Sequence, residues 1–148
     1  EQLEKERIAL EQALEHEVWS CRQHWLRFSW QYTWQAQDAA GLKLDTTLGF
    51  NDRAGLRNGC ALRFRPWSHA QEHRGRIEVL PLVFMDAHFY DYLTAGADTV
   101  TEQIRHWLEE IKFVHGTATV LWHQRVLSRD YGWREGYGVV LENVKAGL

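Results

Sequence analysis

The run IEVLPLVFM at residues 77–85 is the most apolar stretch of the chain, and it indicates the fold class. A short, nearly continuous apolar run is typical of a strand buried on both faces, as in parallel sheets. Pro81 interrupts the run, and because proline cannot donate a ladder hydrogen bond, we expect a bulge or a local break there. The run TATVLW at residues 117–122 predicts a second buried strand, which ends at His123.

Helical patterns separate the predicted strands. Residues 1–16 carry leucines at helical spacing and predict a helix with one apolar stripe. Ser29 is expected to cap a helix that ends at Gly41, and Thr99 with Glu102 forms a capping box for another. The helices are expected at 1–16, 30–40, 99–116 and 133–144, short strands at 17–21 and 42–45, and a long irregular segment at 46–76.

This alternation of helix and strand predicts an α/β fold with a parallel sheet and covering helices. A complete β/α barrel typically needs about 250 residues. The 148 residues, which open without a methionine, therefore predict either a single domain or the C-terminal portion of a larger barrel. An incomplete barrel would expose sheet edges and apolar surface, from which self-association is expected.

Composition excludes several classes of protein. Seventeen Lys and Arg stand against 20 Asp and Glu, so the net charge is −3 and the basic surplus of a nucleic-acid binder is missing. No apolar run reaches the roughly 20 residues of a membrane span. Two cysteines, Cys21 and Cys60, predict reduced thiols and favour the cytoplasm, with one disulfide as the open alternative. Motifs of nucleotide-binding loops, serine hydrolases and zincins are not found.

Polar side chains follow the predicted strands, where the active sites of parallel α/β folds lie. They are Arg22 with His24, Asp45, Asp86 with His88, and His123. Arginine holds anions and histidine moves protons near neutral pH, so the set is suited to acid–base or metal chemistry. The alternative for each residue is a capping role, and His123 is the strongest functional candidate because it directly follows a buried strand.

Two further patterns have competing interpretations. His69 and His73 would share one face of a helix, as a metal pair requires, but they lie in a charged loop segment. Trp25, Trp30 and Trp34 crowd the segment after the first strand. Exposed aromatic rings stack on sugars, so these residues, Trp25 among them, are candidates for binding a saccharide, with core packing as the alternative.

Three segments together resemble a divergent branch of the polysaccharide deacetylases, the NodB-homology or carbohydrate esterase 4 superfamily. They are CRQHWLRFSWQYTWQAQDAAGLKLDTTLGFNDRAGLRNGCALRFRPW at 21–67, LPLVFMD at 80–86 and TVLWHQ at 119–124. The resemblance extends from about residue 4 to residue 141. It implies a distorted β/α barrel and a hydrolase that removes N-acetyl or O-acetyl groups from a surface polysaccharide or its precursor, using a divalent metal, usually zinc.

The resemblance also implies roles for individual residues. His123 resembles the general acid that protonates the leaving amine, and Arg22 resembles the arginine that orients the catalytic base. Leu121 resembles the apolar residue that lines the acetyl pocket. Asp45, Asp52 and Arg57 belong to the branch signature and are expected near the substrate.

The metal-binding motifs of the family have no counterpart in the expected order. A paired Asp motif is not found, and His69 and His73 follow Arg22 although the corresponding motif should precede it. Arg-Gln-His also stands where Arg-x-Pro-Tyr is usual. We therefore expect the metal ligands upstream of residue 1, and none within this segment. The alternative is a catalytically inactive deacetylase-like module that binds a saccharide or a protein partner.

Overall fold

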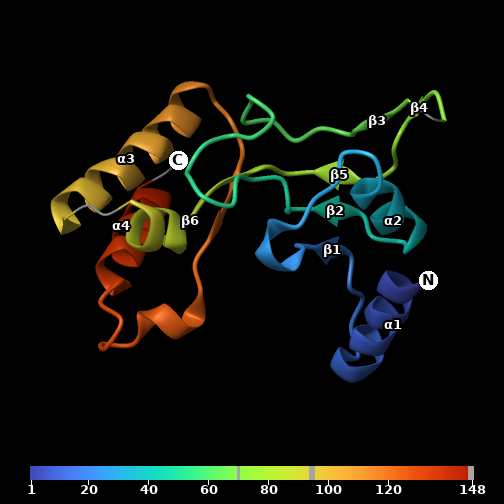
Figure 1. Cartoon of the computed structure of the whole chain (residues 1–148), viewed down its shortest axis with the longest axis horizontal. Helices are drawn as coiled ribbons and strands as arrows, with labels where there is room; N and C mark the ends of the chain where they lie inside the picture. Colours follow the sequence, from blue (N-terminus) through green and yellow to red (C-terminus); the bar gives the residue numbers. More distant parts are fainter. Residues whose placement is uncertain (70, 94–95, 147–148) are drawn as a thin grey trace. The chain divides into compact units, whose positions relative to one another are not determined.

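The computed structural model describes residues 1–69, 71–93 and 96–146 and contains both helices and strands (Figure 1). The chain divides into two compact units. Unit 1 comprises residues 1–48 and 63–80, and unit 2 comprises residues 49–62 and 81–148. The predicted α/β composition is confirmed, whereas neither unit contains a closed barrel among its described residues.

Unit 1 is built on a three-stranded parallel sheet. Its strands are β1 (Ser20–Cys21), β2 (Leu44–Asp45) and β5 (Glu78–Val79), in the order β1-β2-β5. Cys21, Asp45 and Val79 are partners across the sheet, so the three strands end at one level. Parallel pairing is what the alternating pattern predicted, and it places the residues that follow β1 and β2 beside each other.

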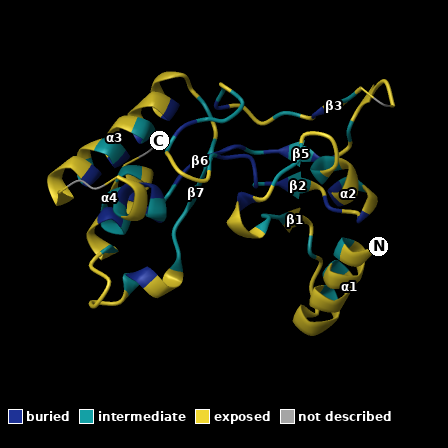
Figure 2. Cartoon of the chain, in the orientation of Figure 1, coloured by how far each residue is buried: buried dark blue, intermediate teal, exposed yellow. Residues whose placement is uncertain are grey.

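The helices of unit 1 differ in detail from the prediction. α1 (Gln2–Leu14) forms as expected but has no buried residue, so its leucine stripe is not covered (Figure 2). α2 (Thr33–Ala39) begins three residues late, because the carbonyl of Ser29 accepts the Thr33 amide in a turn and the Ser29 side chain does not cap the helix. Gly41, with φ at 80°, ends it as predicted.

The segment predicted as irregular contains a hairpin. β3 (Trp67–Ser68) pairs antiparallel with β4 (His73–Arg74), with Trp67 opposite Arg74. His69 and His73 are therefore exposed hairpin residues, and the helical geometry considered for them as a metal pair is wrong. The charged side chains of this segment suit a solvent-exposed hairpin as well as they suit a loop.

Unit 2 contains a two-stranded parallel sheet, β6 (Leu82–Met85) with β7 (Thr119–Leu121). Two longer helices of this unit are α3 (Ala97–Phe113) and α4 (Arg134–Lys145), and two short helical turns are η2 (His88–Tyr92) and η3 (Gln124–Leu127). A third short turn, η1 (His24–Leu26), belongs to unit 1. β7 lies within the predicted strand at 117–122, and His123 follows it directly after Trp122.

Pro81 divides the predicted strand at 77–85 into two strands of different sheets. On one side, the Leu80 amide donates to the Asp45 carbonyl as a continuation of the β2–β5 pairing. On the other side, Thr119 donates its amide to the Pro81 carbonyl at the start of the β6–β7 pairing. Proline has no amide hydrogen for a ladder, so the break expected at this position is confirmed.

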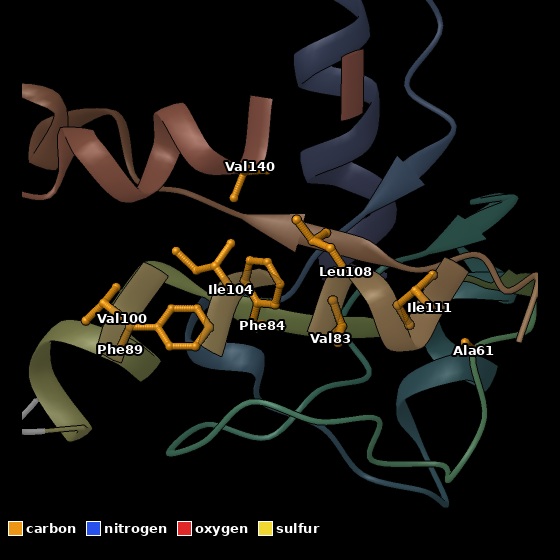
Figure 3. Close-up of a cluster of buried hydrophobic side chains, with 9 residues drawn as sticks. All are labelled: Ala61, Val83, Phe84, Phe89, Val100, Ile104, Leu108, Ile111 and Val140. Atoms are coloured by element: carbon orange, nitrogen blue, oxygen red, sulfur yellow. The ribbon is translucent and has the colours of Figure 1, made fainter. Parts of the chain in front are cut away.

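The core of unit 2 forms where α3 and α4 cover β6 (Figure 3). α3 begins at Ala97 after Gly96, two residues earlier than expected, so the capping box at Thr99 is wrong. Its buried residues, Val100, Ile104, Leu108 and Ile111, recur at helical spacing. The buried residues of the cluster are Ala61, Val83, Phe84, Phe89, Val100, Ile104, Leu108, Ile111 and Val140.

No helix in the described part of the chain is long and apolar enough to cross a membrane. Both cysteines, Cys21 and Cys60, are free thiols.

Candidate functional site

Asp86 and His123 form a hydrogen-bonded pair, the Asp86–His123 dyad, at the ends of β6 and β7. Nδ1 of His123 lies 2.7 Å from Oδ1 of Asp86, and the His123 amide donates to Oδ2 at 2.7 Å. The Ala87 amide also donates to Oδ1 at 2.8 Å. Asp86 is fully buried, whereas the His123 side chain is 36% exposed. The carboxylate is thus fixed inside the unit, and the imidazole reaches solvent.

This geometry determines which nitrogen of His123 is available for chemistry. A carboxylate only accepts hydrogen bonds, so Nδ1 carries a proton and Nε2 is the nitrogen that can gain or release one. No hydrogen bond to Nε2 exists among the described residues. Asp86 holds the imidazole in one orientation, as the aspartate does in the catalytic triads of serine hydrolases. The dyad can therefore hold a proton at Nε2 and deliver it to a substrate.

Leu121 lies on the same side of the chain as His123. It is half-buried and pairs with Met85 across the β6–β7 sheet. His123 follows it by two residues in extended backbone, and side chains two residues apart in such backbone share a face. Trp122, between them, packs against Tyr90 and Tyr137 instead. A contact of Leu121 with substrate stays a prediction that this placement permits.

His88, the other histidine near the end of β6, is built into the fold. It is 3% exposed, its Nδ1 accepts the Met85 amide at 3.2 Å, and its Nε2 lies 3.0 Å from the Phe50 carbonyl. Burial lowers the pKa of His88, although the Phe50 carbonyl and the charges of Asp52 and Asp86 oppose this effect. Both ring nitrogens are used, so His88 fastens the segment at Phe50 to β6.

Asp52 and Arg57 lie in the segment 49–62 of unit 2. Asp52 is exposed and pairs with Arg53 at 3.3 Å. Arg57 donates from Nη1 to the Gly49 carbonyl at 3.3 Å, which fixes the loop. Both interactions join residues of the same loop. The predicted contacts of Asp52 and Arg57 with substrate stay predictions.

Arg22 and Asp45 come together in unit 1, at the ends of β1 and β2. Nε of Arg22 donates to the carbonyl and the hydroxyl of Thr46, at 3.1 and 3.2 Å. Burial lowers the pKa of Arg22, and the charge of Asp45 raises it. Neither Nη atom has a hydrogen bond among the described residues, so the outer edge of the guanidinium can take an anion.

Asp45 is fully buried and surrounded by donors. Its carboxylate accepts Trp34 Nε1 at 3.0 Å, Gln37 Nε2 at 2.8 Å, and both the amide and the hydroxyl of Thr47. These bonds tie α2 to the end of β2. The predicted role of Asp45 in contacting substrate is untested, and the geometry gives it a structural role.

Trp25 is held in an unusual backbone conformation. It has φ 59° and ψ 23°, and Leu26 after it has φ 49°. Two consecutive non-glycine residues in the left-handed region cost free energy, and such strain concentrates at functional sites. Trp25 is 67% exposed and lies beside Arg27, whose guanidinium carbon is 5.3 Å from the indole centroid. Core packing is therefore excluded for Trp25, whereas Trp34 is anchored to Asp45.

The described residues contain no group of three His, Cys, Asp or Glu side chains that could hold a metal ion. His69 and His73 do not gather a third ligand in that part of the chain. These residues therefore offer no three-ligand group for the divalent metal that the resemblance implies.

Sequence reasoning placed Asp86 at a strand end but gave it no role. Its pairing with His123 depends on β6 and β7 being parallel neighbours, although 37 residues separate the two side chains in the chain. The signal that could have found it is the repetition of one pattern, an apolar strand followed at once by a polar residue, in VFMD and VLWH.

Comparisons with protein-family models, curated proteins and solved structures gave no match to this chain.

Proposed function

We propose that this chain carries the acid–base residue of a carbohydrate deacetylase that hydrolyses the N-acetyl or O-acetyl group of a sugar in a surface polysaccharide or its precursor. The observation that supports the proposal most is the Asp86–His123 dyad, which presents a histidine Nε2 to solvent at the end of a parallel strand pair. The resemblance of residues 21–67, 80–86 and 119–124 to polysaccharide deacetylases supports the same reaction and a β/α barrel.

His123 supplies the proton that amide hydrolysis requires. Water adds to the acetyl carbonyl and gives one proton to the catalytic base that the resemblance implies, and the bond between carbon and nitrogen then breaks. The amine is a poor leaving group unless it is protonated, so the imidazolium of His123 gives the Nε2 proton to the departing nitrogen. Acetate and the amino sugar are released. Asp86 keeps the ring oriented and stabilises its charged form until transfer.

Arg22 and Leu121 complete the proposed assignment. Leu121 would contact the acetyl methyl, since it shares a face with His123. Arg22 would hold a carboxylate through its free Nη atoms, as the arginine of the resembling family orients the catalytic base. A divalent metal would supply Lewis-acid activation of the carbonyl in that family. The described residues offer no three-ligand site for it, so its ligands are no part of this assignment.

The test is acetate release from N-acetylated oligosaccharides by the full-length protein, which would include the metal ligands expected upstream of residue 1. It is measured with and without added zinc, for wild type and three variants. His123→Ala should lower turnover about 10²-fold or more, the usual contribution of a general acid. Asp86→Asn should also lower it, because an amide cannot accept at both positions that Asp86 uses. His106→Ala, on the exposed face of α3, is the matched control. Unchanged turnover in His123→Ala would remove this residue from the mechanism.

A second candidate is a deacetylase-like module that binds a saccharide or a protein partner without catalysis. The observation that favours it is the exposure of three indoles, Trp25, Trp30 and Trp67, which are 67%, 57% and 57% exposed. Elemental analysis of the dialysed chain discriminates between the two functions when it is combined with the acetate assay. Saccharide binding without acetate release, whatever metal is supplied, would favour the binding module.

A further inference from the structure

Unit 1 contains a cavity of about 520 Å³ that the proposed chemistry does not use. Trp30 and α2 form one wall, and the hairpin of β3 and β4 with residues 75–77 forms the other. The volume lies within the ordinary range of small-molecule sites. Its lining residues all belong to unit 1, whereas the Asp86–His123 dyad belongs to unit 2.

Three indole rings line this cavity. Trp30 and Trp67 are each 57% exposed, which is a large apolar area to leave in water. Trp34 stands at an edge-to-face angle of 84° to Trp30, with ring centroids 5.4 Å apart, and its Nε1 is bonded to Asp45. Trp30 and Trp34 are thus fixed by each other before any ligand arrives, and pre-organisation of this kind favours binding.

Charged groups stand beside the rings. Arg74 is the cross-strand partner of Trp67, so both side chains project from the same face of the hairpin. Arg74 is exposed and makes no ion pair among the described residues. Arg76 pairs with Asp38 at 3.1 Å. The wall therefore carries one positive charge in excess, on the residue next to an exposed indole.

The wall also contains a buried hydroxyl without a hydrogen bond. Oγ of Ser68, on β3, has no partner among the described residues. An unsatisfied hydroxyl costs free energy unless a ligand or water completes it. The indole of Trp67 and the unpaired guanidinium of Arg74 occur together on one face of the hairpin, and Ser68, the next residue of β3, projects from the opposite face.

We propose that this cavity binds a hexose ring that carries a carboxylate, as in a uronic acid. The apolar face of the ring stacks on Trp67 and Trp30, and Arg74 binds the anion by its paired N–H donors. Asp38 and Arg76, at the rim, are placed for the ring hydroxyls. The choice of a sugar rests on the proposed function, and the inference adds that the polysaccharide is acidic.

The experiment is calorimetric titration of the chain with two tetrasaccharides. One alternates glucuronate with N-acetylglucosamine, and the other contains N-acetylglucosamine alone. Trp67→Ala should weaken binding of both at least tenfold, the loss expected for an aromatic anchor. Arg74→Ala should weaken binding of the acidic tetrasaccharide about tenfold and leave the neutral one unchanged. Trp19→Ala, which removes an exposed indole outside the cavity, is the matched control and should bind as wild type.

Folding and selectivity are measured in parallel. Circular dichroism and thermal unfolding establish that each variant is folded, and Trp67→Phe, which keeps a ring, should retain part of the affinity. The inference is overturned if neither tetrasaccharide binds to the folded chain, or if Trp67→Ala binds as Trp19→Ala does. Tighter binding of adenosine monophosphate than of the acidic tetrasaccharide would also overturn it, since a nucleotide would then be the better ligand.

The outcome is separable from that of the proposed function. His106→Ala, an exposed site on unit 2, should bind both tetrasaccharides as wild type does, because no residue of unit 2 lines the cavity. Binding without acetate release would reject the deacetylase and support the cavity. Acetate release by wild type, together with unchanged tetrasaccharide binding by Trp67→Ala, would support the deacetylase and reject the cavity.

Discussion

Two histidines follow β6 and β7, and their hydrogen-bond partners give them opposite roles. His123 bonds a carboxylate through one nitrogen and leaves the other exposed. His88 uses both nitrogens on backbone groups and is buried. An amide N–H can only donate and a carbonyl can only accept, so His88 must be neutral with its proton on Nε2. One histidine is therefore suited to exchanging a proton, and the other is suited to stabilising the fold.

The first prediction concerns acid stability through His88. Burial places the pKa of His88 below its ordinary value of 6.5. Between 6.5 and the pKa of the folded state, His88 therefore binds a proton in the unfolded chain but not in the folded chain. The free energy of unfolding should then fall as pH decreases from about 6.5, with a slope of at most about 1.4 kcal/mol per pH unit, and level off below the folded pKa. Urea unfolding between pH 8 and pH 5 measures this slope.

His88→Gln isolates this contribution. The glutamine amide can still donate to the Phe50 carbonyl but does not titrate, so the variant should be less stable at pH 8 and lose less stability on acidification. Exposed carboxylates contribute equally to both proteins, and the difference between them reports His88 alone. His106→Gln, an exposed histidine on α3, should keep the wild-type slope. Identical slopes in wild type and His88→Gln would mean that His88 is protonated in the fold.

At the scale of the element, packing decides what a residue does, and two glycines of α4 illustrate this. Both Gly136 and Gly138 lower helix propensity, and sequence alone predicts the same effect for the two residues. In the structure, a Cβ on Gly136 would lie 2.6 Å from Tyr90 Oη and 2.9 Å from Trp122 Cη2. A Cβ on Gly138 would meet no atom within 4 Å. Gly136 is therefore required for close approach, and Gly138 is not.

The second prediction compares alanine at these two positions. Gly138→Ala should stabilise the chain by about 0.5–1 kcal/mol, the helix propensity of alanine over glycine. Gly136→Ala gains the same propensity but forces Tyr90 or Trp122 to move, and overpacking of this kind costs about 1–3 kcal/mol. The net effect should be destabilising. Thermal and urea unfolding of the two variants measure the difference, and equal stabilisation of both would show that Tyr90 yields freely.

Elements were predictable from sequence where one physical signal dominated. The apolar periodicity of α3 identified its buried face, because helical spacing alone determines which residues point inward. Pro81 marked a break, because proline lacks a donor. The start of α2 was wrong by three residues, since Ser29 forms a turn in place of a side-chain cap, and the start of α3 was wrong by two, since Gly96 is the N-cap. The hairpin of β3 and β4 was missed because each strand has only two residues, which is too short for an alternating pattern.

For the whole molecule, the α/β class and the polar residues at the strand ends were predictable from sequence. Which of these residues contact each other was not. Arg22 with Asp45 and Asp86 with His123 meet because particular strands are neighbours, and strand order is a property of tertiary contacts. The division into two units was also not foreseen. It follows from Pro81, where one apolar run leaves the sheet of unit 1 and enters that of unit 2.

Apolar burial is distributed unevenly over the molecule. α3 buries four residues in the core of unit 2, whereas α1 buries none. α1 is instead held by polar contacts, with Arg7 Nε donating to the Ala40 carbonyl at 2.7 Å and Glu11 accepting the Val18 amide at 3.0 Å. Polar contacts at the surface contribute little to stability, so α1 is expected to open far more easily than α3.

The third prediction tests this distribution by hydrogen exchange with a pair of isoleucine variants. Amides of α3 and β6 should exchange orders of magnitude more slowly than those of α1 at neutral pH. Ile104→Ala removes a fully buried side chain and should cost about 2–5 kcal/mol, which accelerates exchange in α3 at least about thirtyfold. Ile8→Ala, at a residue 41% exposed on α1, should leave exchange in α3 unchanged. If α1 is protected as strongly as α3, its leucine stripe must be covered in solution, and the polar contacts of Arg7 and Glu11 would not be what holds the helix.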